Sequence, residues 1–428
     1  MRTVTSLAIW VALVLVIHGC KSGVADRNGV TAARRRETAL IRRLGYENTD
    51  ENTLFRLRAA EELGELAQND ARAARDLVKA LFARTYYEAN VERVLVRNAA
   101  LSDEVTAAAV LNAYKSVGDV ADSQLDCLLI VLARMAGRAK TAVPFLRQEL
   151  QEPHEPRSEG QIRVALANVG WDSQENIARI EEGLMAVAER REEGGEPVAP
   201  EAKPVGQGAL MMMAFSTPGK WVTQRIVALL SRCLEVDDVD DGTFAVSALG
   251  HLSERARPVL AQLKSHLNAA ASNPDRAAKA IACGFAIAEI DPSESAAAMR
   301  AVAKCAGSER VDPHGLYAIL LLETDQMPEE LMRELVILVD DRDEIVATGA
   351  AIALSCAGAR AHDAVPGLLR IVKSARSQKL RRNAAMALSC VATPADVRAL
   401  EERAKAEESE SIRDVLNEGI KALKGYAY

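Results

Sequence analysis

The sequence predicts an all-α fold, an α-solenoid built of stacked antiparallel helix pairs. Of the 428 residues, 49% are hydrophobic but only 4% are aromatic, a composition that favours helices over strands. Apolar residues recur at helical spacing, as they do between 365 and 372. The near-copies AAIALSC at 350–356 and AAMALSC at 384–390 lie 34 residues apart, which indicates one structural unit used repeatedly.

Residues 1–19 predict an export signal. A short basic start precedes an uninterrupted apolar run at 4–17, which is too short for a comfortable transmembrane helix. The residues Ile17-His18-Gly19-Cys20 resemble the lipobox of bacterial lipoproteins, although His18 departs from its usual pattern. Two other readings of this segment stay open: cleavage after Ala25, which would release a soluble exported protein, and an uncleaved short anchor.

The lipobox resemblance implies that Cys20 carries lipid and becomes the mature N-terminus. Several acyl chains on one residue give stable membrane anchoring. Because Lys21 rather than Asp follows the cysteine, the sorting rule of the lipoproteins implies the outer membrane, on its periplasmic side, if the cell has one. We therefore expect an exported protein of the bacterial cell envelope.

Changes in composition divide the rest of the chain. A polar tether covers 20–36, helical repeats cover 37–189, a Pro/Gly/Met-rich linker or insertion covers 190–219, and further repeats cover 220–425. A capping residue before proline marks helix starts at Asp291-Pro292, Asp312-Pro313 and Thr393-Pro394. Within the insertion, GALMMMAF at 208–215 is either an exposed binding surface or, as we favour, a short helix packed on the solenoid.

Two helix types alternate along the repeats. The first type opens with AVPFL at 142–146, ARPVL at 256–260 and AVPGL at 364–368. The second type includes RAAEELGELA at 58–67, FAVSALGHL at 244–252 and RRNAAMALSCVA at 381–392. These pairs resemble HEAT repeats, which implies roughly ten helix pairs stacked into a curved solenoid with a concave face that binds partners.

Alignment of the second helices places several cysteines in one column. The column contains His251, Cys283, Leu322, Cys356 and Cys390. A position that accepts either cysteine or leucine predicts a packing position rather than a pair of reactive sites.

The expected function is a non-catalytic, membrane-tethered scaffold or adaptor for another protein of the cell envelope. In HEAT repeats the second helices usually line the concave face, so the resemblance implies partner-binding roles for Arg58, Glu61, Lys279, Arg381 and Arg382. An alternative from another class is an accessory factor for an enzyme or cofactor pathway, resembling the HEAT-like bilin lyases.

Sequence motifs for catalysis are absent, and we expect no catalytic residues, metal, cofactor or small-molecule substrate. The chain has no G-x-S-x-G, Walker, H-E-x-x-H or C-x-x-C pattern. Asp237-Asp238 and Asp240-Asp241 could form a weak cation site, but solvated turn residues are the simpler interpretation. A formal net charge of -7 and few aromatic residues disfavour nucleic-acid binding.

Overall fold

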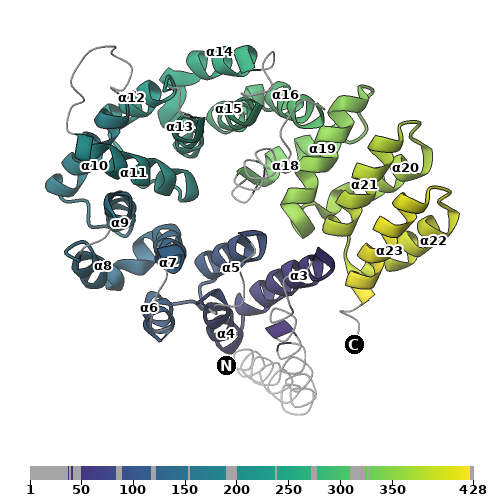
Figure 1. Cartoon of the computed structure of the whole chain (residues 1–428), viewed down its shortest axis with the longest axis horizontal. Coiled ribbons are helices and arrows are strands. Elements are labelled where there is room, and N and C mark those ends of the chain that lie inside the picture. The colour runs from purple at the N-terminus through teal and green to yellow at the C-terminus, as the bar shows by residue number, and fades with distance from the viewer. Residues whose placement is uncertain are drawn as a thin grey trace, which may run out of the picture.

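A computed structural model describes residues 50–82, 89–116, 122–152, 155–188, 200–236, 239–270, 277–308 and 327–424, together with residues 37, 40, 41, 320, 323 and 324. The predicted signal peptide, Cys20 and the predicted tether lie outside the described residues. Every regular element in the described part is a helix, and most of these helices alternate between an inner and an outer layer, with α15 and α16 as an exception (Figure 1). The all-α solenoid predicted from the sequence is therefore confirmed.

The inner layer is a continuous stack in which each helix packs on the next. Its members are α3 (Asp50–Ala67), α5 (Ala89–Leu101), α7 (Asp122–Met135), α9 (Pro156–Asn168), α11 (Lys203–Phe215), α13 (Val239–His251), α15 (Ala277–Ile290), α16 (Ser295–Gly307), α19 (Glu344–Ala357), α21 (Gln378–Val391) and α23 (Glu410–Lys424).

The outer layer covers this stack. Its members are α4 (Ala71–Phe82), α6 (Ala107–Lys115), α8 (Val143–Glu149), α10 (Gln174–Ala188), α12 (Gln224–Cys233), α14 (Leu260–Ala270), α20 (Val365–Ser374) and α22 (Val397–Ala406). Helix α18 (Glu329–Leu338) packs on α16 and α19. Short 3-10 helices join several pairs, namely η1 (Ala136–Ala142), η3 (Pro200–Ala202), η4 (Ser253–Val259), η6 (Pro292–Glu294), η7 (Gly358–Ala364) and η8 (Pro394–Asp396).

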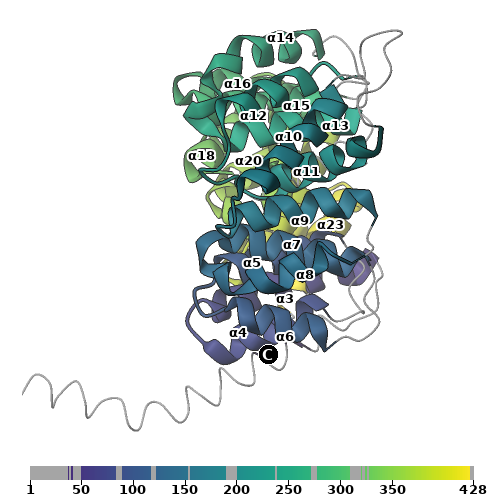
Figure 2. The same ribbon diagram turned by 90° about the vertical axis from the view of Figure 1, so that its left-hand side faces the viewer.

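The solenoid closes into a ring. The last inner helix, α23, contacts the first described one, α3, and the helices follow one another around a circle (Figure 1). Figure 2 shows the ring from its edge, with α14 at the top of the view and α4 and α6 at the bottom. The sequence predicted curvature but not closure.

Glycines bring some helices unusually close together. A Cβ added at Gly160 of α9 would overlap the carbonyl oxygen of Val205, and one added at Gly208 of α11 would overlap that of Arg157. Between α16 and α19, Gly307 and Gly349 abut each other's backbone in the same way. These pairs approach closer than helices separated by ordinary side chains, which lie about 8–10 Å apart. Because shorter spacing in the inner layer increases curvature, these contacts favour a ring.

The methionine-rich segment is an ordinary member of the inner layer. Helix α11 covers 203–215 and packs on α9, α10 and α13. Met212 and Met213 are fully buried, whereas Met211 and Phe215 are partly exposed. The expected packed helix at 208–215 is thus present.

One continuous helical stretch, Glu344–Ser374, is long and apolar enough to cross a membrane among the residues that the structure describes. It consists of α19, η7 and α20, and 61% of its most apolar window is buried inside the protein. Most of its hydrophobic residues therefore belong to the core of the solenoid, whereas Ile345 is exposed.

A repeated arginine ties successive repeats together. Arg138, Arg255 and Arg360 each lie in the 3-10 helix after an inner helix and donate to backbone carbonyls 33–38 residues earlier in the chain. Arg255, for example, donates to the Gly219 oxygen at 3.1 Å, and Arg360 to the Thr324 oxygen at 2.8 Å. Arg138 also donates to the Ala100 oxygen in the last turn of α5, where a helix leaves its carbonyls without intrahelical partners.

A residue with positive φ precedes each of these arginines by two positions. The φ angles are 48° at Ala136, 49° at Ser253 and 62° at Gly358. A left-handed conformation costs a non-glycine residue roughly 1–2 kcal/mol. We expect Ala136→Gly and Ser253→Gly each to raise the free energy of unfolding by about 0.5–1 kcal/mol after the entropy cost of glycine, and Gly358→Ala to lower it by about 1–3 kcal/mol. Urea unfolding of the three variants measures this, and stabilisation by Gly358→Ala would contradict the strained geometry.

Candidate functional site on the inner face of α19, α21 and α23

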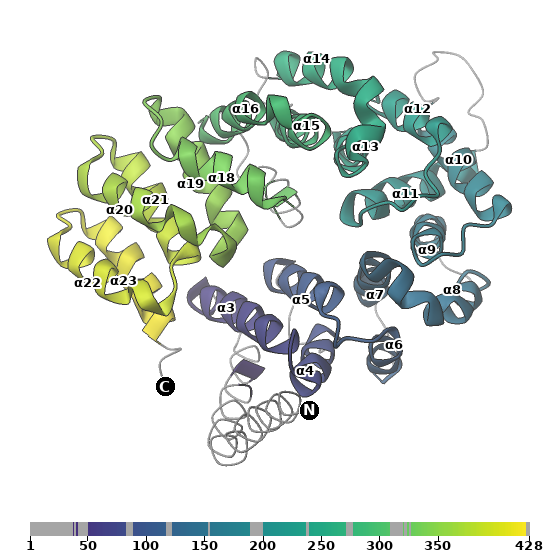
Figure 3. The same cartoon turned by 180° about the vertical axis from the view of Figure 1, so that it is seen from behind.

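Helix α21 leaves one side uncovered, and this side faces the inside of the ring. It packs against α19, α20 and α23, which account for its other three sides (Figure 3). The uncovered stripe carries Lys379, Arg382 and Met386, all exposed, with Asn383 and Cys390 partly exposed. Spacings of three, four and seven residues place these side chains on one helical face. Met386 is 39% exposed, which is notable for a large apolar residue.

The neighbouring inner helices continue this surface with different chemistry. At the matching positions of α19 lie Ile345, which is 47% exposed, and the partly exposed Ile352 and Cys356. On the other side, α23 exposes Asp414 and Glu418. We call the exposed and partly exposed side chains of Ile345, Ile352, Lys379, Arg382 and Met386 the inner patch.

The structure separates the predicted partner-binding residues into different roles. Among the three whose side chains are described, only Arg382 is exposed. Arg381 lies 3.8 Å from the carboxylate of Glu407, which is almost fully buried and also pairs with Arg403 at 2.9 Å. Arg381 therefore anchors the end of α22 to α21.

The other predicted contacts lie elsewhere. Lys279 is partly buried and donates to the Leu234 carbonyl at the end of α12, a capping role. Arg58 and Glu61 belong to α3, but their side chains lie outside the described residues. The apolar members of the inner patch were missed by the sequence analysis, although aligning the two ALSC copies places Ile345 opposite Lys379 and Ile352 opposite Met386.

The cysteine column is not uniform in its surroundings. Cys283 is fully buried, and burial raises the pKa of its thiol to about 12, as expected for a packing residue. Cys356 and Cys390 are partly exposed, and Leu322 lies outside the described residues. The packing interpretation therefore holds most strictly for Cys283.

His251, in the same column, belongs to a buried polar cluster. Its Nε2 lies 2.9 Å from the Ala214 carbonyl oxygen, and its Nδ1 lies 3.6 Å from the Glu289 carboxylate. Nearby, the Ser247 hydroxyl donates to the buried carboxylate of Glu323. This cluster links α11, α13 and α15 to Glu323, which is itself helical.

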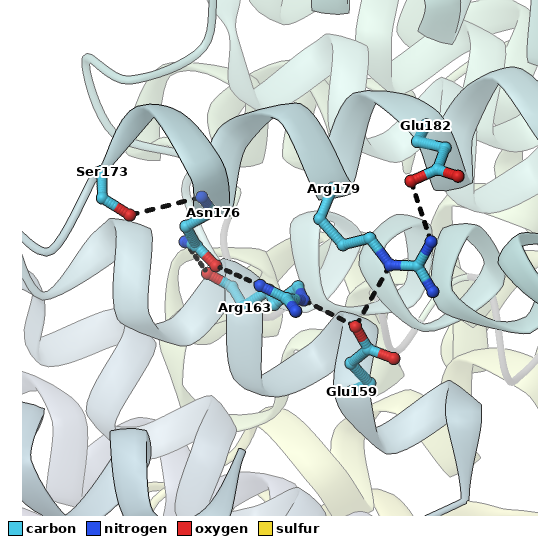
Figure 4. Close-up of polar contacts among 6 residues, drawn as sticks. All are labelled: Glu159, Arg163, Ser173, Asn176, Arg179 and Glu182. Atoms are coloured by element: carbon cyan, nitrogen blue, oxygen red, sulfur yellow. Dashed lines mark hydrogen bonds and ion pairs between the residues drawn. The ribbon is translucent and has the colours of Figure 1, made fainter. Parts of the chain in front are cut away.

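A second polar cluster joins α9 and α10 (Figure 4). The Glu159 carboxylate accepts hydrogen bonds from Arg163 at 2.8 Å and Arg179 at 3.3 Å, and Arg179 also donates to Glu182 at 2.8 Å. Fully buried Asn176 donates to the Arg163 carbonyl at 3.0 Å. Two positive and two negative charges balance, so this cluster holds the helix pair together.

Of the acidic residues considered as a weak cation site, Asp241 has a structural role. Asp241 is buried and accepts a hydrogen bond from Gln207 at 2.9 Å, whereas Asp237 and Asp238 lie outside the described residues. In the described part of the chain, no group of three or more His, Cys, Asp or Glu side chains is placed to hold a metal ion.

No protein-family model matches this sequence, and no curated protein matches it significantly. Solved structures with a similar arrangement of helices include Kap121p, at 13% identity and a TM-score of 0.32 over 90% of this chain and 45% of that chain. Kap121p bound to Nup53p aligns at 13% identity and a TM-score of 0.31 over 89% of this chain and 44% of that chain.

A chain from a structure of the phosphorylation-controlled interaction between cadherin and beta-catenin aligns at 12% identity and a TM-score of 0.23, over 90% of this chain and 98% of that chain. This chain thus spans about 45% of the length of Kap121p. All these similarities concern the helical-repeat fold.

Proposed function

We propose that the protein is a non-catalytic scaffold, tethered to a membrane of the bacterial cell envelope, that binds a protein partner through the inner patch. The observation that carries this proposal is the uncovered stripe of α21, where Met386 is 39% exposed beside exposed Lys379 and Arg382. Protein interfaces combine buried apolar anchors with surrounding polar and charged groups, and Met and Arg are enriched in them.

A crosslinking pull-down from intact cells tests the binding site. We expect the wild-type chain to recover one envelope protein, and Arg382→Glu to lose it because a reversed charge disrupts the interface. Arg381 is left unchanged because it anchors Glu407. The matched control is Arg398→Glu on the outer helix α22, where the arginine side chain is 90% exposed.

The outcomes separate the possible functions. If the partner is lost from Arg382→Glu but recovered with Arg398→Glu, the result supports a scaffold that binds on its inner face. If the partner is recovered with both variants, the inner patch is not the binding site. Recovery of no partner from any strain would favour the accessory-factor alternative instead.

The membrane tether has its own test. We propose that Cys20 carries the lipid, so Cys20→Ala should move the protein from the membrane fraction to the soluble fraction. Cell fractionation followed by immunoblotting measures this, with Cys390→Ala as a cysteine control in α21. Unchanged membrane partition of Cys20→Ala would contradict lipid anchoring at this residue.

A further inference from the structure

One segment of this acidic chain is strongly basic. Between Asp363 and Asp396 the sequence contains six Lys and Arg residues and no Asp or Glu, although the chain as a whole has a formal net charge of -7. The segment covers most of α20 and all of α21. A local reversal of charge creates a positive potential that attracts negatively charged groups.

Some of these cations have partners within the protein: Arg370 pairs with Asp340, and Arg381 lies beside Glu407. The side chains of Lys373, Arg376, Lys379 and Arg382 are exposed. Lys379 and Arg382 belong to the uncovered stripe of α21.

These two cations occupy an unfavourable place for helix stability. They lie in the first turns of α21, which contain no acidic residue, and positive charges are disfavoured near the positive end of a helix dipole. Ser377 already caps this end through its side chain, which accepts from the Leu380 amide at 3.2 Å. The positive potential of the helix end therefore adds to that of the side chains.

The apolar part of the inner patch lies beside the cations. Met386 follows Lys379 by seven residues, or about 10 Å along the helix. At the matching positions of α19, Ile345 corresponds to Lys379 and Ile352 to Met386. The surface of the two helices therefore combines cations with Ile345 near the start of α21 and is apolar at Ile352 and Met386. The acidic side chains of Asp414 and Glu418 bound the patch on the α23 side.

We propose that the inner patch binds an acidic amphipathic helix of the protein partner. Its carboxylates contact Lys379 and Arg382, and its apolar residues, about two turns further along, contact Ile352 and Met386. This inference rests on the proposed scaffold function and specifies the chemistry of the partner. A membrane surface fits less well, because the patch lies on the inner wall of a ring, where a flat bilayer does not reach (Figure 1).

Fluorescence anisotropy with synthetic helical peptides tests this chemistry on the full-length chain. The first peptide carries four glutamates in its N-terminal turns followed by a leucine stripe. The second replaces the glutamates with lysines, and the third replaces the leucines with serines. We expect only the first peptide to bind well, with affinity that falls as salt is raised, because the charges attract across the interface.

Variants on the protein side complete the test. Lys379→Glu/Arg382→Glu should weaken binding of the acidic peptide by about tenfold or more, and Met386→Ser should weaken it at every salt concentration. The control Arg398→Glu/Lys405→Glu reverses two charges on the outer helix α22 and should bind as wild type does. Circular dichroism and thermal unfolding confirm that each variant is folded.

Several results would overturn the proposal. Equal binding of the lysine peptide, or no effect of Lys379→Glu/Arg382→Glu, would exclude charge recognition at this patch. Sedimentation with phosphatidylglycerol vesicles that depends on Lys379 and Arg382, without peptide binding, would assign the patch to anionic lipid. A crosslinked partner that depends on Arg382 while the acidic peptide fails to bind would retain the scaffold function and reject only this partner chemistry.

Discussion

Replacing Gly208 with alanine is expected to destabilise the protein by about 3 kcal/mol and to open the ring. In most helices the same substitution is favourable by roughly 0.5–1 kcal/mol, because alanine loses less backbone entropy on folding. Here the added Cβ would overlap the carbonyl oxygen of Arg157 in α9. Overpacking costs typically 1–3 kcal/mol and occasionally more, and a backbone obstacle cannot move aside by changing rotamer. Helices α9 and α11 must therefore separate.

Gly137→Ala provides the matched control. This glycine lies in η1, and an added Cβ would meet nothing within 4 Å. Urea unfolding compares the two variants, and small-angle X-ray scattering measures whether the radius of gyration rises in Gly208→Ala. Gly160→Ala tests the other side of the same contact and should behave as Gly208→Ala does. If Gly208→Ala and Gly160→Ala both kept the stability and the radius of gyration of the wild type, the close approach of α9 and α11 would be contradicted.

The sequence predicts the helices and their stacking, but not the close contacts between helices that curve the stack into a ring. Helical periodicity and the spacing of the ALSC copies predicted the solenoid, and the Asp291-Pro292 and Thr393-Pro394 helix starts are confirmed by η6 and η8. Asp312-Pro313 lies outside the described residues. Closure of the ring was not predictable, because it depends on small differences in helix spacing summed over many repeats. A glycine within a helical pattern does not say which backbone it touches.

The candidate site was predictable in part for a similar reason. Repeat alignment assigned Arg381 and Arg382 the same role on a second helix, but only Arg382 is exposed, whereas Arg381 lies beside Glu407. The two residues point about 100° apart around the helix, so one reaches Glu407 and the other the inner face. Likewise, the alignment placed His251 among packing cysteines, whereas its neighbours in space make it part of an ionic cluster.

The His251 cluster predicts that the protein loses stability as pH rises above about 6.5. Nε2 of His251 faces the Ala214 carbonyl and Nδ1 faces the Glu289 carboxylate, so both ring nitrogens face acceptors and the charged imidazolium fits best. Burial by itself lowers the pKa of His251. The hydrogen bond to Glu289, the charges of Glu289 and Glu323 and the Ala214 carbonyl outweigh burial, and the pKa lies above its ordinary value of 6.5. A group with a raised folded-state pKa stabilises the fold below its unfolded-state pKa, and this contribution disappears as pH rises through the folded-state value.

Glu289→Gln tests this arrangement because it removes a buried charge while keeping the shape of the side chain. Leaving one member of a buried ion pair alone costs roughly 3–5 kcal/mol, and we expect a loss near the lower end because glutamine retains a hydrogen-bonding oxygen. The control Glu329→Gln changes a carboxylate that is 61% exposed beside Arg360, and exposed pairs contribute about 0–1 kcal/mol. Urea unfolding of all three proteins from pH 6 to pH 9 gives the free energy at each pH. The advantage of wild type over Glu289→Gln should be largest near pH 6 and shrink as pH rises, whereas an advantage that is constant or grows with pH would show that His251 is neutral in the folded protein.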